Sequence, residues 1–380
     1  MLSLLLALAC TKPADTSPAA AHETLDLAAQ LATEGITTWP PDTIPLGWNE
    51  SVWAYGVHRL HAASGDPQWH DYYQAWMEDE LPEFTDDDPR AFGASDEMSP
   101  AILASVAMLE ADNAHLEPIT AAAHSYLDTA PRTAEGAIVH WGPDSTFGDT
   151  RQVWIDSMFM FGVFLLREHE RTGQRAYLDR FLEQYDLFSQ HCRDPSAQLY
   201  RHAYDDETGE NIPTDEVFWA RGNAWVLVAA AELMAAVGPD SADAAAVLPL
   251  FLAQAEAIAD VQADDGLWRT VLNDPFDDPD NYTETAASGL IGYALALGVK
   301  SGALEGDRWL DVLARAAEGI DGRVERGGEL VVEGTSFGTN PGDYDYYLSI
   351  VQLDDTNLGV GTTVMFLSEL DGLELPGESP

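Results

Sequence analysis

The chain alternates helix-like segments with turns rich in Gly, Pro and Asp, and this alternation limits the folds open to it. Hydrophobic periodicity predicts twelve helices in succession. Their approximate bounds are 24–34, 50–63, 67–81, 97–111, 116–129, 151–171, 175–191, 217–236, 241–263, 283–301, 306–322 and 357–370. Successive helices joined by short links favour pairs that pack side by side.

Short strand-like pieces recur in the longer links between these helices. They begin at residues 136, 198, 266 and 328, at intervals of 62, 68 and 62 residues. Such an interval holds one pair of long helices and a loop, and repeats of this kind stack and share a core. Six pairs form an open solenoid or a closed ring, and the absence of an evident polar capping repeat favours closure. We therefore predict one all-α domain, an (α/α)6 toroid with short β-like loops at one end.

The composition fits a large folded domain with an acidic surface. Of 380 residues, 46% are hydrophobic, which is enough for a sizeable core. The 65 Asp and Glu residues far outnumber the 18 Lys and Arg residues. Nucleic acid and anionic lipid are therefore excluded as natural partners. The acidic residues form many short clusters, so most of them belong to a solvated surface.

The N-terminus resembles a bacterial lipoprotein signal. An apolar run too short to span a bilayer ends at Cys10, although no basic residue precedes it. A Pro-, Ala- and Ser-rich tether follows. We predict a signal and tether over 1–23 and the folded domain over 24–380. The protein would lie in the cell envelope, secreted or held to the membrane only through a lipid on Cys10.

Unusual polar and aromatic residues concentrate at the N-termini of the even-numbered predicted helices. They are Trp48, Asn49, Asp96, Asp156, Trp219, Arg221, Tyr282, Glu284, Asp354, Asp355 and Asn357. Alternation of inner and outer helices places these N-termini at one end of the inner ring. His140 and His202 lie in loops at the same end. The helix dipoles there favour an anionic ligand.

Asp156 is the most unusual of these residues, because it lies near the start of an otherwise apolar helix predicted over 151–171. A carboxylate among apolar side chains is costly unless it is hydrogen-bonded or near a cation. One interpretation is a simple N-terminal cap. The other is a carboxyl group whose pKa is raised by apolar walls, so that it can donate a proton near neutral pH.

Six motifs in order, from about Trp48 to Leu370, resemble a known enzyme group. They are Pro131-Arg-Thr with Gly136 and His140; Gln152-Val-Trp-Ile-Asp156-Ser-Met; Leu199-Tyr-Arg-His202; Phe218-Trp-Ala-Arg221-Gly-Asn-Ala-Trp225; Gly266-Leu-Trp268 with Asn281-Tyr-Thr-Glu-Thr-Ala-Ala-Ser288; and Gly334-Thr-Ser-Phe-Gly with Asp343-Tyr-Asp-Tyr-Tyr347 and Gly359-Val-Gly361. The chain is similar to the unsaturated glucuronyl and rhamnogalacturonyl hydrolases, glycoside hydrolase families 88 and 105, and is closer to family 105.

This resemblance implies a six-hairpin toroid that needs no metal or organic cofactor. It also implies a substrate, an anionic oligosaccharide left by a polysaccharide lyase with a 4,5-unsaturated uronic acid at its nonreducing end. In the family an acid protonates C4, water adds at C5, and the hemiketal opens to release the next sugar. Asp156 matches the catalytic acid/base of the family. Asp96 matches the second essential carboxylate, with Glu97 as a rival.

The resemblance also implies substrate-binding residues. His202, Trp219 and Arg221 match positions that line the sugar site, and His140 lies at the same end. Arg221 can bind a carboxylate through two parallel hydrogen bonds, or it can form a structural ion pair. The flat faces that sugar rings need are available from some of Trp48, Trp53, Trp219 and Trp225. Like-charge repulsion would keep Asp156 protonated beside an ionised Asp96.

Three alternatives to this function remain open. An inverting exo-glycosidase on the same toroid also uses two carboxylates and cleaves saturated substrates. A glycan-binding surface lipoprotein would keep the aromatic residues and lose nothing when Asp156 is changed. A lyase would create an alkene and not consume one.

Overall fold

The computed structural model describes residues 19–142, 150–274 and 278–376. Cys10 and the predicted signal lie outside these residues, so the lipid anchor stays a prediction. The first helix, α1 (Ala19–Thr38), begins before the predicted domain boundary at residue 24.

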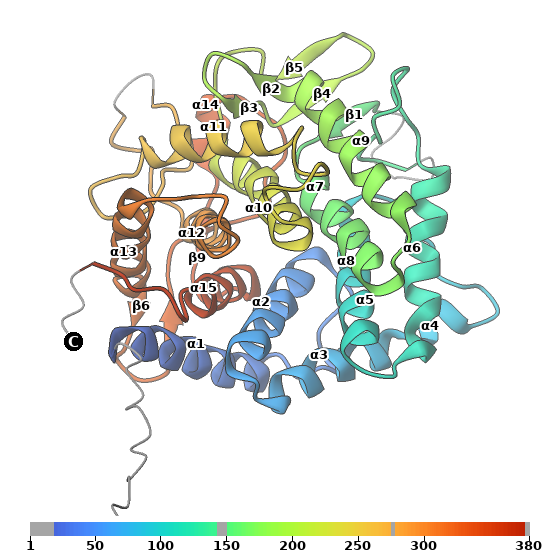
Figure 1. Ribbon diagram of the computed structural model, residues 1–380, viewed down its shortest axis with the longest axis horizontal. Coiled ribbons are helices and arrows are strands. Elements are labelled where there is room, and N and C mark those ends of the chain that lie inside the picture. The colour runs from blue at the N-terminus through green and yellow to red at the C-terminus, as the bar shows by residue number, and fades with distance from the viewer. Residues whose placement is uncertain (1–18, 143–149, 275–277, 377–380) are drawn as a thin grey trace, which may run out of the picture.

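An inner ring of helices forms the centre of the molecule (Figure 1). It consists of α2 (Trp48–Ser64), α5 (Pro100–Glu110), α8 (Gly162–Thr172), α10 (Ala220–Val237), α12 (Thr285–Lys300) and α15 (Asn357–Glu369). Each of these helices contacts the next, and α15 contacts α2. The ring is therefore closed, and the predicted (α/α)6 toroid is confirmed.

An outer layer of helices alternates with the inner ring along the chain. Its long members are α1, α3 (Pro67–Glu80), α6 (Glu117–Thr129), α9 (Arg175–Cys192), α11 (Leu248–Ala259) and α13 (Asp307–Asp321). Outer helices are apolar on one face only, as α13 shows with buried Trp309, Leu313 and Ile320. The remaining helical pieces are short: α4 (Pro82–Thr85), η1 (Asp96–Met98), η2 (Ala114–Leu116), α7 (Ser157–Met160) and α14 (Tyr344–Ser349).

Inner helices are apolar on nearly all sides because protein surrounds them. Helix α10 is long and apolar enough to cross a membrane by composition alone, yet 83% of it is buried inside the fold. It is therefore a core helix. The thiol of Cys192 also lies in the core, where this residue is 1% exposed.

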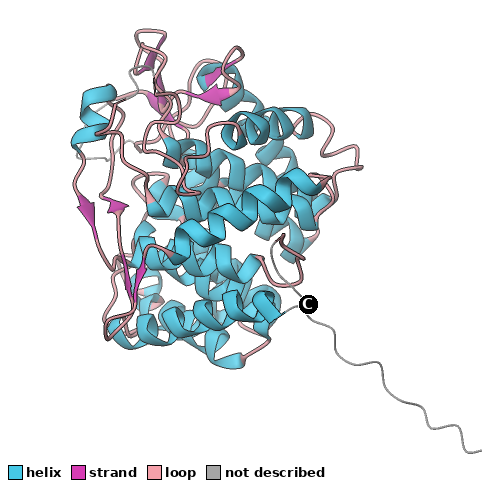
Figure 2. Ribbon diagram, turned by 90° about the vertical axis from the view of Figure 1, so that its left-hand side faces the viewer, coloured by secondary structure: helices cyan, strands magenta, loops and turns pink. Residues whose placement is uncertain are grey.

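Short strands connect the helices outside the helical body, along its left and upper edges in Figure 2. The strands pair antiparallel and form small sheets. One sheet contains β1 (Gln152–Trp154), β4 (Ala203–Asp205) and β5 (Glu210–Ile212). The others are two-stranded and pair β2 (Arg193–Asp194) with β3 (Leu199–Tyr200), β6 (Val324–Glu325) with β7 (Val331–Val332), and β8 (Thr335–Ser336) with β9 (Gln352–Leu353). The predicted strand-like pieces at 198–202 and 328–332 contain β3 and β7. Those at 136–140 and 266–270 form single bridges only.

The helix predicted over 151–171 is wrong in its first part. Residues 152–154 form β1, and α7 and α8 follow with Phe161 between them. The backbone of 152–154 pairs with 203–205 of β4, and the β-branched and aromatic side chains of Val153 and Trp154 suit a strand. This strand has a direct consequence for the site described below.

A buried network of charged and hydroxyl groups connects several helices of the inner ring. Arg167 of α8 donates to Glu232 of α10. The other carboxylate oxygen of Glu232 accepts from Tyr55 Oη at 2.5 Å and from Tyr293 Oη. Burial is costly for such charges unless they are paired, and this network pairs them.

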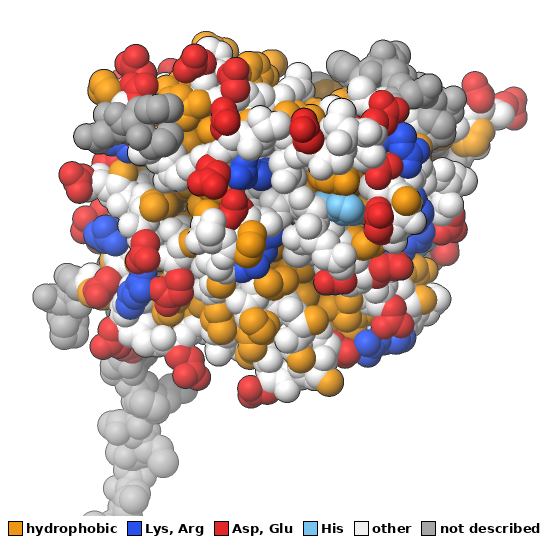
Figure 3. Space-filling view, turned by 90° about the horizontal axis from the view of Figure 1, so that it is seen from above, with side chains coloured by type: hydrophobic (Ala, Val, Ile, Leu, Met, Phe, Trp, Pro, Cys, Tyr) orange, Lys and Arg blue, Asp and Glu red, His pale blue; other side chains and the backbone are white. Residues whose placement is uncertain are grey.

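Acidic side chains are spread over the surface with fewer basic ones among them, as one face shows in Figure 3. They do not collect in a single patch on that face. This distribution agrees with the predicted solvated acidic surface.

Candidate active site

A cavity of about 180 Å³ lies at the N-terminal end of the inner ring. Its walls contain Trp48, Asp96, Trp141, Trp154, Asp156, Met160, Trp219, Arg221, Trp225, Gly338, Thr339 and Asn340. The structure thus brings six of the predicted site residues to one cavity. The two predicted histidines, His140 and His202, lie directly behind its carboxylates.

Strand pairing places Asp156 beside His202. β1 and β4 align Trp154 with Ala203, and Ile155 N donates to His202 O at 3.1 Å. The next residue, Asp156, therefore comes to the end of the pair, where its Oδ2 lies 3.1 Å from His202 Nε2. Asp156 precedes α7 but makes no side-chain cap hydrogen bond, so the capping interpretation is wrong.

A second backbone contact places Asp96 beside His140 in the same manner. Ser95 N donates to His140 O at 2.9 Å, and His140 N donates to Gln152 O at 2.8 Å. Asp96 Oδ2 then lies 3.7 Å from His140 Nε2. The rival Glu97 is exposed and accepts from Gly93 N, so Asp96 is the carboxylate that lines the cavity.

The two carboxyl groups differ in their affinity for protons. Burial raises the pKa of Asp96 well above its ordinary value, and the negative charges of Asp156 and Glu97 raise it further. Burial also favours protonation of Asp156, but the neighbouring His202 outweighs it and lowers the pKa of Asp156. These opposite shifts favour the proton on Asp96 and the ionised form of Asp156, the reverse of the distribution expected from the sequence.

His140 and His202 are both completely buried. Burial lowers the pKa of His140 to about 3, so its ring is neutral near pH 7. The ring stacks on Trp154 with centroids 4.0 Å apart. The His202 ring stacks on Trp219 with centroids 4.2 Å apart. Each imidazole thus stacks on an indole, while its Nε2 lies close to a carboxylate.

Arg221 lines the cavity, but its guanidinium group is occupied by the protein. It is 1% exposed and forms an ion pair with Glu284 at 3.0 Å. Its other N–H groups donate to Ser336 O at 2.8 Å, Phe337 O at 2.7 Å and Thr339 Oγ1 at 3.1 Å. The expected paired contact with a ligand carboxylate does not fit this arrangement. Arg221 instead fixes the loop 336–340, which forms one wall of the cavity.

Aromatic side chains make the other walls. Trp48 is half-buried at the mouth, whereas Trp219 and Trp225 are almost completely buried. Trp53, a further candidate, packs against Trp39 and Tyr72 in the core and does not line the cavity. Several features were missed by sequence reasoning: Trp154, the loop 338–340 and the tyrosine on α14 that contacts His202. For this tyrosine, the cluster of tyrosines at 344–347 was the one feature of the sequence that could have indicated it.

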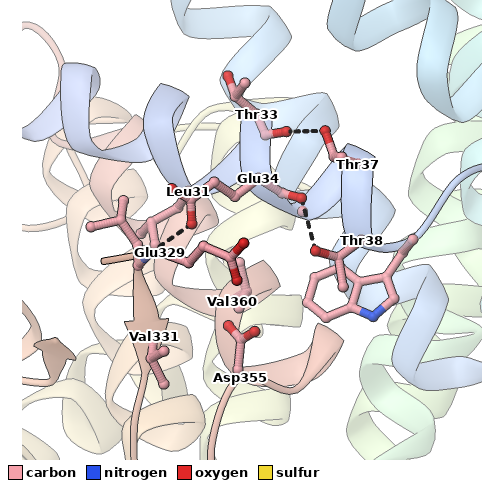
Figure 4. Close-up of a pocket in the computed structure, with 12 residues that line it drawn as sticks. Leu31, Thr33, Glu34, Thr37, Thr38, Glu329, Val331, Asp355 and Val360 are labelled. Carbon is pink, nitrogen blue, oxygen red and sulfur yellow. Dashed lines mark hydrogen bonds between the residues drawn. The ribbon is translucent and has the colours of Figure 1, made fainter. Parts of the chain in front are cut away.

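A second cavity, of about 240 Å³, lies between α1, β7 and the start of α15 (Figure 4). Its lining includes the carboxylates of Glu34, Glu329 and Asp355, but no lysine, arginine or histidine among the described residues. An anionic sugar would be repelled there. Within the described ranges, no group of three or more His, Cys, Asp and Glu residues is arranged to hold a metal ion.

Comparison with known proteins identifies the family. The profile of Glycosyl Hydrolase Family 88 matches residues 26–373, nearly the whole described chain. The chain belongs to glycosyl hydrolase family 88. Among curated relatives of this family 88 chain, the unsaturated rhamnogalacturonyl hydrolase YesR of Bacillus subtilis is 26% identical over 73% of this chain and 78% of its own. An unsaturated 3S-rhamnoglycuronyl hydrolase of Formosa agariphila is 28% identical over 58% of each chain.

Solved structures share the fold of this glycoside hydrolase. A possible member of family 105 from Klebsiella pneumoniae has a TM-score of 0.80 at 22% identity, covering 94% of this chain and 95% of its own. The unsaturated glucuronyl hydrolase of Bacillus sp. GL1 has a TM-score of 0.72 at 18% identity, covering 93% and 97%. The chain is thus a glycoside hydrolase of the 88/105 group, as its motifs predicted.

Proposed function

We propose that this enzyme removes a 4,5-unsaturated uronic acid from the nonreducing end of oligosaccharides that polysaccharide lyases produce, of the rhamnogalacturonan type. The relatives named for unsaturated rhamnogalacturonyl and rhamnoglycuronyl substrates support this substrate class. The observation that carries the proposal is the carboxyl pair. One protonated and one ionised group face a single cavity lined with tryptophan, which suits addition of water to an alkene.

The reaction we propose is hydration of the enol ether. Asp96 gives its proton to C4 of the alkene, and positive charge develops at C5 and the ring oxygen. Water adds at C5 while Asp156 takes one of its protons. The hemiketal then opens, and the bond to the next sugar breaks. One proton has moved from Asp96 to Asp156 through substrate and water, and exchange with solvent restores the starting state.

The walls of the cavity fit the substrate in two ways. The indole rings provide flat apolar surfaces for sugar rings. Arg221 places a positive charge behind the loop 336–340, and Asn340 carries an amide donor on the cavity side of that loop. Both favour the carboxylate of the uronic acid.

The proposed hydration mechanism requires an ionised Asp156 and a protonated Asp96. The pH profile of kcat/KM is then bell-shaped. The acid limb reports the protonation of Asp156, whose pKa is lowered, and the alkaline limb reports the loss of the proton from Asp96, whose pKa is raised. Because the two groups interact, each limb reports an apparent pKa of the carboxyl pair and not the pKa of one isolated residue.

The decisive substitution is Asp156→Asn. It keeps the size of the side chain but removes the base, and loss of such catalysis costs about 10²–10⁴-fold in rate. The fold should survive because Asp156 caps no helix. The measurement is the loss of ultraviolet absorbance of the conjugated alkene in lyase-generated disaccharides.

The matched control is Glu97→Gln, a change in an exposed carboxylate next to Asp96. This variant should keep its turnover near pH 7 within a few-fold of wild type, and only its alkaline limb should move, to lower pH, because the Glu97 charge raises the pKa of Asp96. Wild-type turnover by Asp156→Asn would remove Asp156 from the mechanism. Cleavage of the saturated disaccharide by wild type at a comparable rate would replace hydration with ordinary inverting hydrolysis, the second candidate.

A further inference from the structure

A hydrogen bond holds the His202 ring on the side opposite to Asp156. His202 Nδ1 lies 3.0 Å from the hydroxyl of Tyr347 on α14. The same hydroxyl accepts from Gly342 N at 3.1 Å. Tyr347 is completely buried, and its ring lies parallel to Trp219, within 4°, with centroids 6.1 Å apart. Tyr347, His202 and Asp156 therefore form one connected series.

The direction of the hydrogen bonds in this series follows from the donors available. Gly342 N–H can only donate, so it occupies an acceptor position of the Tyr347 oxygen. The proton of the buried phenol then needs an acceptor, and His202 Nδ1 is its neighbour. If His202 Nδ1 carried a proton instead, the hydroxyl proton would have no acceptor among the contacts that the described residues make with it. A buried donor without an acceptor is unfavourable.

We propose that Tyr347 is a positioning residue that fixes the tautomer of His202. Its hydroxyl donates to Nδ1, so the N–H of the imidazole is on Nε2, the nitrogen that lies 3.1 Å from Asp156 Oδ2. An N–H this close to the carboxylate stabilises its ionised form, whereas the other tautomer would place a lone pair next to it. The inference rests on the proposed function, in which ionised Asp156 accepts a proton from water.

Several titratable groups surround His202 and Asp156 and contribute to the electrostatic potential at them. Asp96 of η1 and His140 face Asp156 from the neighbouring loops, and Glu97 adds charge beyond Asp96. Arg221 of α10 lies on the far side of Trp219, with its Cζ 4.9 Å from the indole centroid. Replacing Tyr347 by Phe changes none of these charges. A change in titration would therefore come from the imidazole.

The test is Tyr347→Phe, which removes the hydroxyl and keeps the ring. His202 is then free to place its proton on Nδ1, and Asp156 binds protons more readily. The acid limb of the kcat/KM profile should move to higher pH by about one unit, a tenfold change in the ionised fraction on that limb. The alkaline limb, which reports Asp96, should stay in place.

Tyr346→Phe is the matched control on the same helix. The Tyr346 hydroxyl accepts from Asn340 N at 3.2 Å, so this variant loses a comparable anchor of the loop but no contact with His202. Any effect of a loosened loop should appear in both variants as a rise in KM. Only Tyr347→Phe should move the acid limb. Equal shifts in the two variants would overturn the proposal.

A second measurement does not depend on substrate. In ¹⁵N-labelled protein, nuclear magnetic resonance distinguishes Nδ1–H from Nε2–H histidines, and a His202→Gln variant identifies the His202 signals. We expect Nε2–H in wild type and in Tyr346→Phe, and a mixture or Nδ1–H in Tyr347→Phe. Nδ1–H in wild type would overturn the inference. If the tautomers are as expected but no unsaturated disaccharide is consumed, the proposed function fails and the inference about Tyr347 stands.

Discussion

At the scale of single residues, Arg221 has a role that can be separated from ligand binding. Its guanidinium reaches one carboxylate, two carbonyls and one hydroxyl from a fixed plane. A lysine ammonium cannot reach all of these partners together. We therefore expect Arg221→Lys to lower the free energy of unfolding by about 1.5–3 kcal/mol, the value of one lost hydrogen bond to a charged group. KM should also rise, because the loop 336–340 forms a wall of the cavity.

Urea unfolding checks this expectation, with Arg175→Lys as the control. Arg175 pairs with Asp179 and Asp243 at the surface, where its side chain is 55% exposed. Surface pairs contribute little, so this variant should unfold as wild type does. An Arg221→Lys protein of wild-type stability with a greatly raised KM would restore the direct contact with the substrate carboxylate that the sequence suggested.

The identity of the site residues could be predicted from sequence, but their protonation states and partners could not. Asp96 and Asp156 were recognisable because each lies at the start of a predicted apolar helix, and Asp156 also lies within one of the motifs. Which one holds the proton depends on His202 and His140, whose distances to the carboxylates come from strand pairing. Arg221 and Glu284 are 63 residues apart, and Ser336 is 115 residues from Arg221. No local pattern indicates that such distant residues meet.

At the scale of elements, two glycines allow the ring to close. A Cβ atom on Gly361 of α15 would lie 2.5 Å from Trp53 Cα of α2, and one on Gly56 of α2 would lie 2.3 Å from Gly361 O. The first and last inner helices therefore touch through their backbones. Gly361→Ala should destabilise the fold by about 1–3 kcal/mol through overpacking. This loss outweighs the gain in helix propensity of about 1 kcal/mol.

Gly328→Ala is the control for that substitution, since nothing lies within 4 Å of its added Cβ. Urea unfolding of both variants should separate them clearly. An unchanged stability in Gly361→Ala would mean that α2 and α15 can move apart at little cost.

Helices were more predictable than the loops that position the site. Both layers follow from apolar periodicity, and the bounds of α2, α3, α9 and α13 agree with the prediction within a few residues. The main error was β1, because Gln152-Val-Trp adjoins an apolar helix and its partner strand lies 50 residues further on. Since β1 places Asp156 beside His202, nothing in the sequence indicated the contact that lowers the pKa of Asp156.

At the scale of the whole molecule, the net charge of −47 dominates the electrostatics. The described chain contains ion pairs, such as Arg308 with Asp260 at 2.6 Å, but basic residues are too few to pair most carboxylates. Repulsion among the remaining acidic groups favours an expanded chain. The acidic surface also repels an anionic substrate, so the groups that attract the substrate have to act at short range inside the cavity.

Salt should therefore stabilise this protein. At 0.5 M salt the screening length is well below the ~8 Å of physiological ionic strength, so repulsion between surface carboxylates is largely removed. Raising NaCl from 10 mM to 0.5 M at pH 7 should raise Tm by a few degrees, equivalent to about 1–2 kcal/mol for a chain of this size. The same comparison at pH 5, nearer to the isoelectric point of about 4.1, should give a smaller rise because the net charge is smaller. A rise of equal size at both pH values would show that salt acts through the general exclusion of ions from the protein surface. A fall in Tm at pH 7 would show that attractive ion pairs outweigh the repulsion of the excess carboxylates.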